Sequence, residues 1–236
     1  PGWTLPNVMG AGGLQALVKG GLPLKGKEVL VAGSGPLLLA VADHLLEAGE
    51  QVIGVIEQAP FGRVMGFGMS LWSSPGKLLQ GMGIKWRLRS VAQHFGSHIK
   101  SVETIGGRLI ATLSLKGRER RMACDYLACA FGLIPNLELP LLLGCPLDAD
   151  GVVKVDEYQM TGTDSVYAAG ELTGVGGVEK ALVEGRIAGY AAAGKADRAR
   201  ALFGQRDAAL DFTRRLSRSF ELPAHLKTLA TDDTIV

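Results

Sequence analysis

A glycine turn between an apolar run and an amphipathic segment constrains this chain more than any other feature. Residues 29–32 are uninterrupted and apolar, as in a parallel strand covered on both faces. Gly33 and Gly35 follow at once, and Pro36 presets the backbone for the first turn of a helix. Apolar residues then recur with helical spacing, and a second apolar run spans residues 51–56. This order predicts a strand, a helix and a parallel strand.

An acidic residue stands at the end of this unit. Glu57 follows the second strand at the separation at which dinucleotide-binding proteins place the carboxylate that binds a ribose hydroxyl. The N-terminus of the helix offers free N–H groups and the positive end of its dipole to a pyrophosphate. The pattern therefore predicts a bound dinucleotide. NAD(H) is preferred over NADP(H), because Glu57 would repel a 2′-phosphate; Arg63 reverses this preference if its loop folds back.

One residue departs from the dinucleotide pattern. Leu38 stands where a small residue is usual, which predicts a helix that is tilted or set further from the strand. The alternative is a glycine turn with no ligand.

Composition limits the class of protein. At 236 residues and 47% hydrophobic residues, the chain holds one or two domains with a substantial core. The net charge of +2 gives no reason to propose nucleic acid as a partner. No run approaches the roughly 20 apolar residues of a transmembrane helix. Three cysteines cannot form a disulfide framework, which favours a cytoplasmic location. The opening Pro1, without Met, indicates a piece of a longer polypeptide.

The remaining chain divides into recognisable segments. We interpret residues 60–72 as a surface loop and expect a helix, capped by Ser73 or Ser74, from near Pro75 through Met82, with further helix from Trp86 to Phe95. Further elements are expected as antiparallel strands at 99–105, 108–115 and 120–130, strands at 151–156 and 165–171, and helices at 178–193 and 197–222.

The cysteines and histidines do not suggest a redox or metal centre. Cys124 and Cys129 lie on one predicted strand, and their odd separation places the side chains on opposite faces. We therefore expect no bridge between them, and no activity of the thioredoxin reductase kind. The four histidines lack metal-ligand spacing. No metal site is predicted, and no catalytic residue can be assigned.

Three segments in a fixed order resemble the two-dinucleotide-binding flavoproteins related to pyridine nucleotide–disulfide oxidoreductases. They are residues 33–36, residues 130–136 and residues 166–171, which resemble the nicotinamide fingerprint, the return crossing and the late FAD motif. A narrower resemblance, to the FAD-containing subunit of opine oxidase, hydrogen cyanide synthase and dye-linked amino acid dehydrogenases, rests on residues 1–9, 33–39 and 231–236.

The resemblance implies a domain plan and a set of cofactor contacts. Residues 1–24 are a linker and remnant of an FAD-binding domain, 25–133 an NAD(P)-binding domain, 134–195 the C-terminal part of the FAD-binding domain, and 196–236 a helical extension. The fold class is α/β, a Rossmann-like parallel sheet with an inserted antiparallel meander. The expected cofactor-binding residues are Gly33, Ser34, Gly35, Pro36, Leu37, Glu57, Gly132, Gly170 and Glu171, the last standing where Asp is usual.

The resemblance also implies a function. Electrons pass between a nicotinamide and FAD in the intact protein, beside a second catalytic subunit, with an amine or amino acid such as an opine as substrate. The family's first FAD-binding unit would precede Pro1, and its iron–sulfur tail would follow Val236, so we expect this chain alone to retain no FAD and to oxidise NADH negligibly. A stand-alone NAD(P)H:acceptor reductase and a non-catalytic scaffold for a partner subunit remain alternatives.

Overall fold

The computed structural model describes residues 1–73 and 75–224. The chain forms two compact units, one of residues 1–132 with the residues from 218 onward, the other of residues 133–217. The expected cap at Ser74 and the resemblance over residues 231–236 lie outside the described residues. No helix in the described ranges combines the length and apolar character needed to cross a bilayer.

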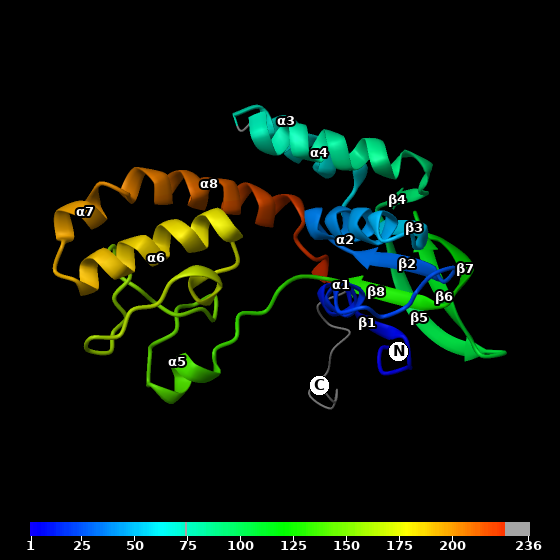
Figure 1. Ribbon diagram of the computed structural model, residues 1–236, viewed down its shortest axis with the longest axis horizontal. Helices are drawn as coiled ribbons and strands as arrows, with labels where there is room; N and C mark the ends of the chain where they lie inside the picture. The colour runs from blue at the N-terminus through cyan, green and yellow to red at the C-terminus, as the bar shows by residue number, and fades with distance from the viewer. Residues whose placement is uncertain (74, 225–236) are drawn as a thin grey trace. The chain divides into compact units, whose positions relative to one another are not determined.

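A five-stranded parallel sheet is the centre of the first unit (Figure 1). Its strand order is β1-β8-β2-β3-β4, and every neighbouring pair is parallel. The strands are β1 (Val8–Gly10), β2 (Glu28–Gly33), β3 (Gln51–Glu57), β4 (Gln93–Phe95) and β8 (Tyr126–Ala130). The predicted strand–helix–strand unit is confirmed as β2, α2 (Pro36–Glu47) and β3.

Alternate residues of β2 enter two different cores. Val29 and Val31 pack with α1 (Ala11–Lys19) and α2 on one face of the sheet. Leu30 faces the other side, where the antiparallel meander of β5 (Ser97–Ile105), β6 (Arg108–Leu115) and β7 (Arg118–Cys124) covers it. Leu38 is fully buried in the first core, so the larger residue is accommodated as packing between helix and sheet. The fold class is therefore α/β with an antiparallel meander, as predicted.

Two expectations for the region after β3 are wrong. The expected loop at 60–72 is instead α3 (Phe61–Ser70) followed by a 3₁₀ turn, η1 (Leu71–Ser73). The next helix, α4 (Pro75–Arg87), runs into η2 (Leu88–Ser90) and stops, and Phe95 lies on β4 rather than on a helix. The ring of Phe61 stands edge-on to that of Phe95, 5.4 Å away, a contact that no local pattern indicates.

The expected strand at 120–130 is in fact two strands. β7 ends at Cys124 and β8 begins at Tyr126 in a different sheet. Asp125 makes the break, because its backbone N–H donates to the Glu28 carbonyl while its carboxylate accepts the Glu28 N–H at 2.9 Å. The two cysteines therefore do not share a strand, although both are free, as expected.

The second unit has less regular structure. Its helices are α5 (Glu138–Leu142), the 3₁₀ turn η3 (Gly170–Thr173), α6 (Val178–Ala192), α7 (Ala196–Arg200) and α8 (Phe203–Ser219), whose last two residues belong to the first unit. The expected helix at 178–193 is confirmed, whereas that at 197–222 is broken into α7 and α8 at Leu202, which is buried with Val183 and Ile187. The segments at 151–156 and 165–171 form isolated bridges rather than strands, because each pairs at single positions only.

Candidate functional site

The turn between β2 and α2 requires glycine at two positions. Gly33 has φ +147°, and a Cβ there would lie 2.0 Å from the carbonyl oxygen of Ala130 on β8. Gly35 has φ +95° and is the N-cap of α2, with Pro36 at the first helical position. The first N–H groups of a helix lack carbonyl partners within it, so this turn presents donors to an anion.

Glu57 is bonded to this turn rather than pointing into solvent. Its Oε2 accepts the Gly35 N–H at 2.8 Å, and its Oε1 accepts the Ser34 hydroxyl at 3.1 Å and the Ala59 N–H at 2.7 Å. The residue is only 6% exposed. Burial raises the pKa of the Glu57 carboxyl above its ordinary value, and these hydrogen bonds partly oppose the rise.

These bonds limit what Glu57 can offer a ribose. A carboxylate has about four lone-pair positions, and three donors already occupy three of them. Only the Ser34 hydroxyl can turn away without moving the backbone. A ribose hydroxyl could therefore use the position left on Oε2 or replace Ser34 at Oε1, and the ribose contact stays a prediction.

A distant segment of the first unit also reaches the turn. The Ser34 hydroxyl lies 3.2 Å from the carbonyl oxygen of Phe220, and the ring of Phe220 lies 3.7 Å from where a Cβ on Gly35 would stand. That ring also stands edge-on to Phe67, 5.3 Å away. Gln58 Nε2 donates to the Phe220 carbonyl at 3.4 Å. No pattern in the sequence indicated that residue 220 would cover the first glycine turn.

A cavity of about 590 Å³ lies beside the end of β3. Gln58 and Ala59 line it next to Glu57, and the polar side chains of Arg63, His98, Lys116 and Glu221 line it further out. Arg63 therefore lies near the carboxyl end of β3, on the first turn of α3. The expected loop is a helix here, and the effect of Arg63 on cofactor preference stays a prediction.

Six of the predicted site residues gather at one edge of the parallel sheet. A seventh, Gly132, lies just past the end of β8, two residues after the Ala130 that pairs with Gly33. It is exposed and has φ +137°. The residues around the turn itself are Gly33, Ser34, Gly35, Pro36, Leu37 and Glu57. The other two, Gly170 and Glu171, belong to the second unit.

The Glu171 side chain has one satisfied and one unsatisfied oxygen. Oε1 accepts the Gly177 N–H at 3.0 Å, whereas the buried Oε2 has no hydrogen-bond partner among the residues described. An orphaned acceptor of this kind fits a hydroxyl donor such as the ribityl chain of a flavin. The residue present therefore fits the contact expected of it.

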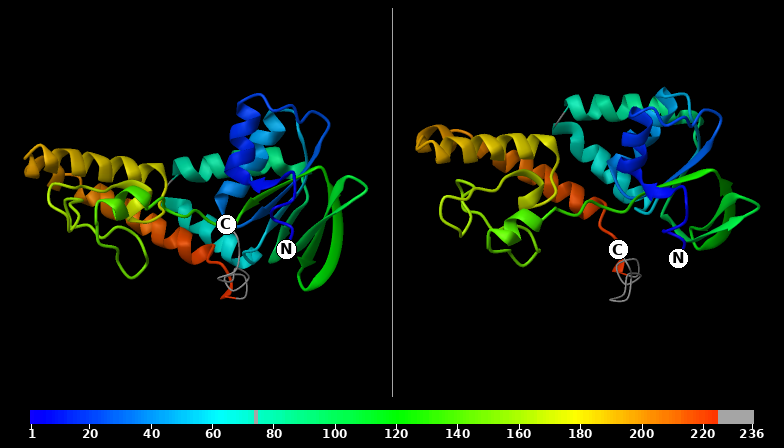
Figure 2. Two further views of the ribbon diagram at one scale, coloured as in Figure 1. Left: turned by 90° about the horizontal axis from the view of Figure 1, so that it is seen from below. Right: turned by 60° about the horizontal axis from the view of Figure 1, so that its bottom comes forward.

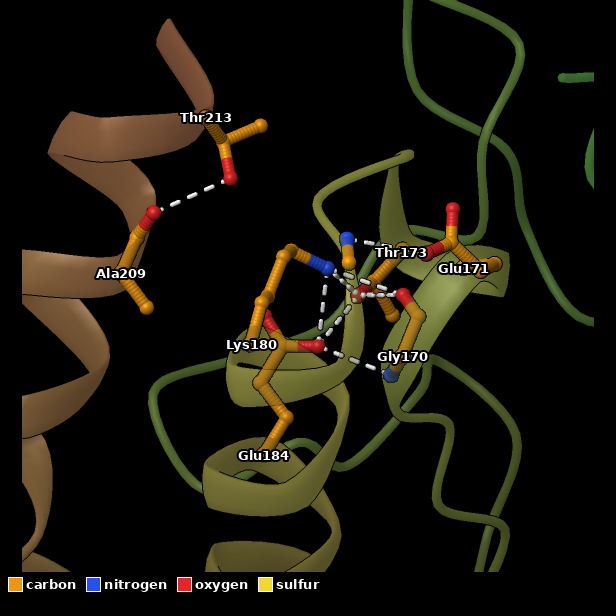
Figure 3. A network of polar contacts seen from close by, with 8 residues as sticks. Gly170, Glu171, Thr173, Lys180, Glu184, Ala209 and Thr213 are labelled. Atoms are coloured by element: carbon orange, nitrogen blue, oxygen red, sulfur yellow. Dashed lines mark hydrogen bonds and ion pairs between the residues drawn. The ribbon is translucent and has the colours of Figure 1, made fainter. Parts of the chain in front are cut away.

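A buried ion pair holds the turn that carries Glu171 (Figure 3). Lys180 Nζ donates to the Gly170 carbonyl at 2.8 Å, to Thr173 Oγ1 at 2.8 Å and to Glu184 Oε2 at 2.9 Å. Glu184 Oε2 also accepts the Gly170 N–H at 2.8 Å. Both side chains of the pair are almost fully inaccessible. This network was not predicted, although a Lys–Glu pair one helical turn apart after a glycine turn is visible in the sequence.

The titratable groups outside these turns suggest no second centre. Among residues 1–73 and 75–224, no three His, Cys, Asp or Glu side chains gather as metal ligands would. Burial raises the pKa of Cys124 to about 12 and that of Cys129 to about 11, so neither thiol is activated.

Comparisons with known proteins agree with this architecture. The chain is 33% identical over 202 residues to the hydrogen cyanide synthase subunit HcnB of Pseudomonas aeruginosa, covering 80% of this chain and 44% of that protein. It is 30% identical over 199 residues to an opine oxidase subunit of Rhizobium meliloti, covering 79% and 43%. The chain thus spans less than half the length of these relatives.

Solved structures share the fold at low sequence identity. The flavoprotein disulfide reductase RclA from Escherichia coli superposes with a TM-score of 0.58 at 20% identity, over 81% of this chain and 41% of that one. The thioredoxin reductase of T. acidophilum gives 0.51 at 23%, over 82% and 55%. The family model described as pyridine nucleotide-disulphide oxidoreductase matches residues 6–200. The chain therefore belongs to the pyridine nucleotide–disulphide oxidoreductase family, whose members bind FAD and NAD(P), and it is related to HcnB and to the opine oxidase subunit.

Proposed function

We propose that this chain is the nicotinamide-binding part of an oxidoreductase subunit that passes electrons between NAD(H) and FAD. The observation that carries the proposal is the turn at Gly33–Gly35, which opens α2 directly beside the buried carboxylate of Glu57. A pyrophosphate at the N-terminus of α2 and a ribose at Glu57 would use both features at once.

Each residue has a binding or positioning part in this proposal. The N–H groups after Gly35 would hold the pyrophosphate, and Glu57 would accept a ribose hydroxyl at Oε2 or in place of the Ser34 hydroxyl at Oε1. Glu171 Oε2 would accept a ribityl hydroxyl, and Lys180 would keep the Gly170 carbonyl in position. FAD, when bound, supplies the redox chemistry itself. NAD(H) is the proposed nicotinamide, with Arg63 as the residue that weakens the preference.

The biological setting is proposed from the relatives. Both are named as subunits, of hydrogen cyanide synthase and of opine oxidase. By analogy the intact protein would work with a second catalytic subunit in an amine or amino acid dehydrogenase of the opine oxidase type, in the cytoplasm. Because the chain spans less than half of those relatives, its substrate and partner rest on the analogy alone.

A second candidate function has a specific observation in its favour. The ring of Phe220 lies over Gly35, and three protein donors already occupy Glu57. A fold that has lost its ligand and serves only as a scaffold for another protein would look the same. Binding of the nucleotide separates the two candidates.

Titration calorimetry of the 236-residue chain with NADH tests the proposal. We expect one NADH per chain, and no binding by a Gly35→Val variant, because its side chain would fill the space of the pyrophosphate. Circular dichroism shows whether that variant folds, and Lys100→Ala, at an exposed ion pair on the meander, is the matched control. Failure of the unmodified chain to bind NADH would favour the scaffold.

A further inference from the structure

The helices α3 and α4 expose large apolar side chains in a regular pattern. Met65, Met69 and Trp72 are spaced by four and three residues, and so share one side of α3 and η1. Leu79, Met82 and Trp86 are spaced by three and four and share one side of α4. Their exposed fractions run from 41% for Met65 to 83% for Trp72. Figure 1 shows both helices beyond α2 at the edge of the first unit, and Figure 2 shows the same cyan and blue-green helices from two other sides.

The opposite sides of both helices are already packed. Phe67 of α3 is buried, and Ile84 of α4 packs against the first core. Arg87 donates through Nε to Asp43 of α2 at 2.5 Å, and its Nη2 forms an ion pair with the same carboxylate. Each helix therefore already buries one side against the first unit. The exposed apolar side is additional and is not covered by the packing of this unit.

The segment that carries these apolar faces contains basic residues and no acidic ones, although one of its basic residues, Arg87, is paired with Asp43 and Glu47 of α2. Residues 61–90 contain five basic residues, Arg63, Lys77, Lys85, Arg87 and Arg89, and no Asp or Glu, although the whole chain carries a net charge of only +2. The Arg89 guanidinium lies 4.7 Å from the centre of the Trp86 ring, so one basic group stands directly at the apolar face. A surface that binds here must accept apolar side chains and be negatively charged.

We propose that α3, η1 and α4 dock this protein onto the surface of an anionic lipid bilayer. Helices that lie in a membrane interface carry Trp, Phe and Leu on one side and Lys and Arg beside them. Trp is favoured there because its ring is apolar and its N–H is polar. Anionic lipids attract each basic group near the surface.

The second unit provides an internal comparison. Ile134 and Leu142 are also strongly exposed, but their segment contains the acidic residues Glu138, Asp148 and Asp150. An anionic bilayer would repel this segment. The proposal therefore concerns α3 to α4 alone, and it is independent of whether the chain binds a nucleotide.

Co-sedimentation with vesicles tests the proposal. The 236-residue chain is mixed with vesicles of phosphatidylcholine, or of phosphatidylcholine with phosphatidylglycerol. We expect binding to the vesicles with phosphatidylglycerol only, weakened by salt. In a Trp3→Phe background, which leaves Trp72 and Trp86, tryptophan fluorescence should shift to shorter wavelength on binding. Replacing Lys85 and Arg89 by Gln should weaken binding roughly five-fold for each charge removed.

Two further variants decide which surface is responsible. Met69→Asp with Trp86→Asp should abolish sedimentation, whereas Leu142→Asp should not change it, with folding of both checked by circular dichroism. Equal binding to both vesicle types, no binding, or loss of binding only in Leu142→Asp would overturn the proposal. A dimer seen by gel filtration that the Met69→Asp, Trp86→Asp variant dissociates, with no vesicle binding, would assign the surface to a second copy and also overturn it.

Discussion

The carboxylate of Glu57 accepts the backbone N–H of Gly35 at 2.8 Å, which joins the end of β3 to the turn before α2. The same carboxylate accepts the Ala59 N–H at 2.7 Å. One buried side chain therefore sets the shape of the glycine turn and the exit of β3. Its substitution should affect both folding and nucleotide binding.

The stability of the chain should depend on pH through Glu57. Burial raises the pKa of its carboxyl above the ordinary value of 4.5, so the folded state binds a proton more tightly than the unfolded state. The stability that this group contributes is present at low pH and is lost as pH rises above 4.5 through the folded pKa. We expect the free energy of unfolding of the wild type, relative to Glu57→Gln, to fall over that range in urea titrations. A difference that rises with pH would show that the N–H donors outweigh burial.

Cofactor preference should depend on Arg63. We expect the wild type to bind NADH more tightly than NADPH, because Glu57 opposes a 2′-phosphate. Arg63→Ala should weaken NADPH binding by roughly tenfold, the loss of one hydrogen bond between charged groups, and leave NADH binding almost unchanged. Calorimetry with both nucleotides measures this, and Arg118→Ala on the exposed strand β7 is the control. An equal effect on both nucleotides would place Arg63 away from the ribose.

Phe220 should compete with the nucleotide. Its ring lies 3.7 Å from the Cβ position of Gly35, where the proposal places a pyrophosphate. Phe220→Ala should therefore strengthen NADH binding, while losing about 1 kcal/mol of stability with the ring contact to Phe67. Leu17→Ala, an exposed residue on α1, serves as the control for both measurements. Unchanged or weaker NADH binding in the Phe220 variant would show that the ring does not block the site.

The buried ion pair should be essential to the second unit. Lys180→Met leaves the Glu184 carboxylate buried without its partner, which costs about 3–5 kcal/mol. Lys195→Met, at an exposed lysine, should change stability by less than about 0.5 kcal/mol. Adding Glu184→Gln to the first variant should recover part of the loss, because the uncompensated charge is removed. Thermal unfolding measures all three, and a loss in Lys180→Met no larger than in the control would contradict the prediction.

The thiols on the two sheets should be unreactive. With pKa values raised to about 12 and about 11, Cys124 and Cys129 hold almost no thiolate at neutral pH. Mass spectrometry after treatment with iodoacetamide should find both unmodified in the folded chain and alkylated in urea. Rapid modification in the folded state would argue for a redox role.

Local pattern was enough to predict the central βαβ unit. The apolar run before Gly33, the helical spacing after Pro36 and the position of Glu57 all lie within about 30 residues, and the structure has them as β2, α2 and β3. Local pattern did not predict α3, because its glycines hide the helical spacing of its apolar residues. It also did not predict that the chain changes sheet at Asp125, because that change depends on hydrogen bonds with Glu28. Such pairings cannot be read from neighbouring residues.

The α/β class and the family could be assigned from the amino-acid sequence, because both follow from short motifs in a fixed order. The residues of the glycine turn could be named in the same way. Three other features emerged only from the folded chain: Glu57 binds that turn, Phe220 covers it, and Lys180 is buried with Glu184. The physical reason is that a hydrogen bond or a buried charge depends on which groups meet in space, and groups such as Ser34 and Phe220 meet although 186 positions separate them along the chain.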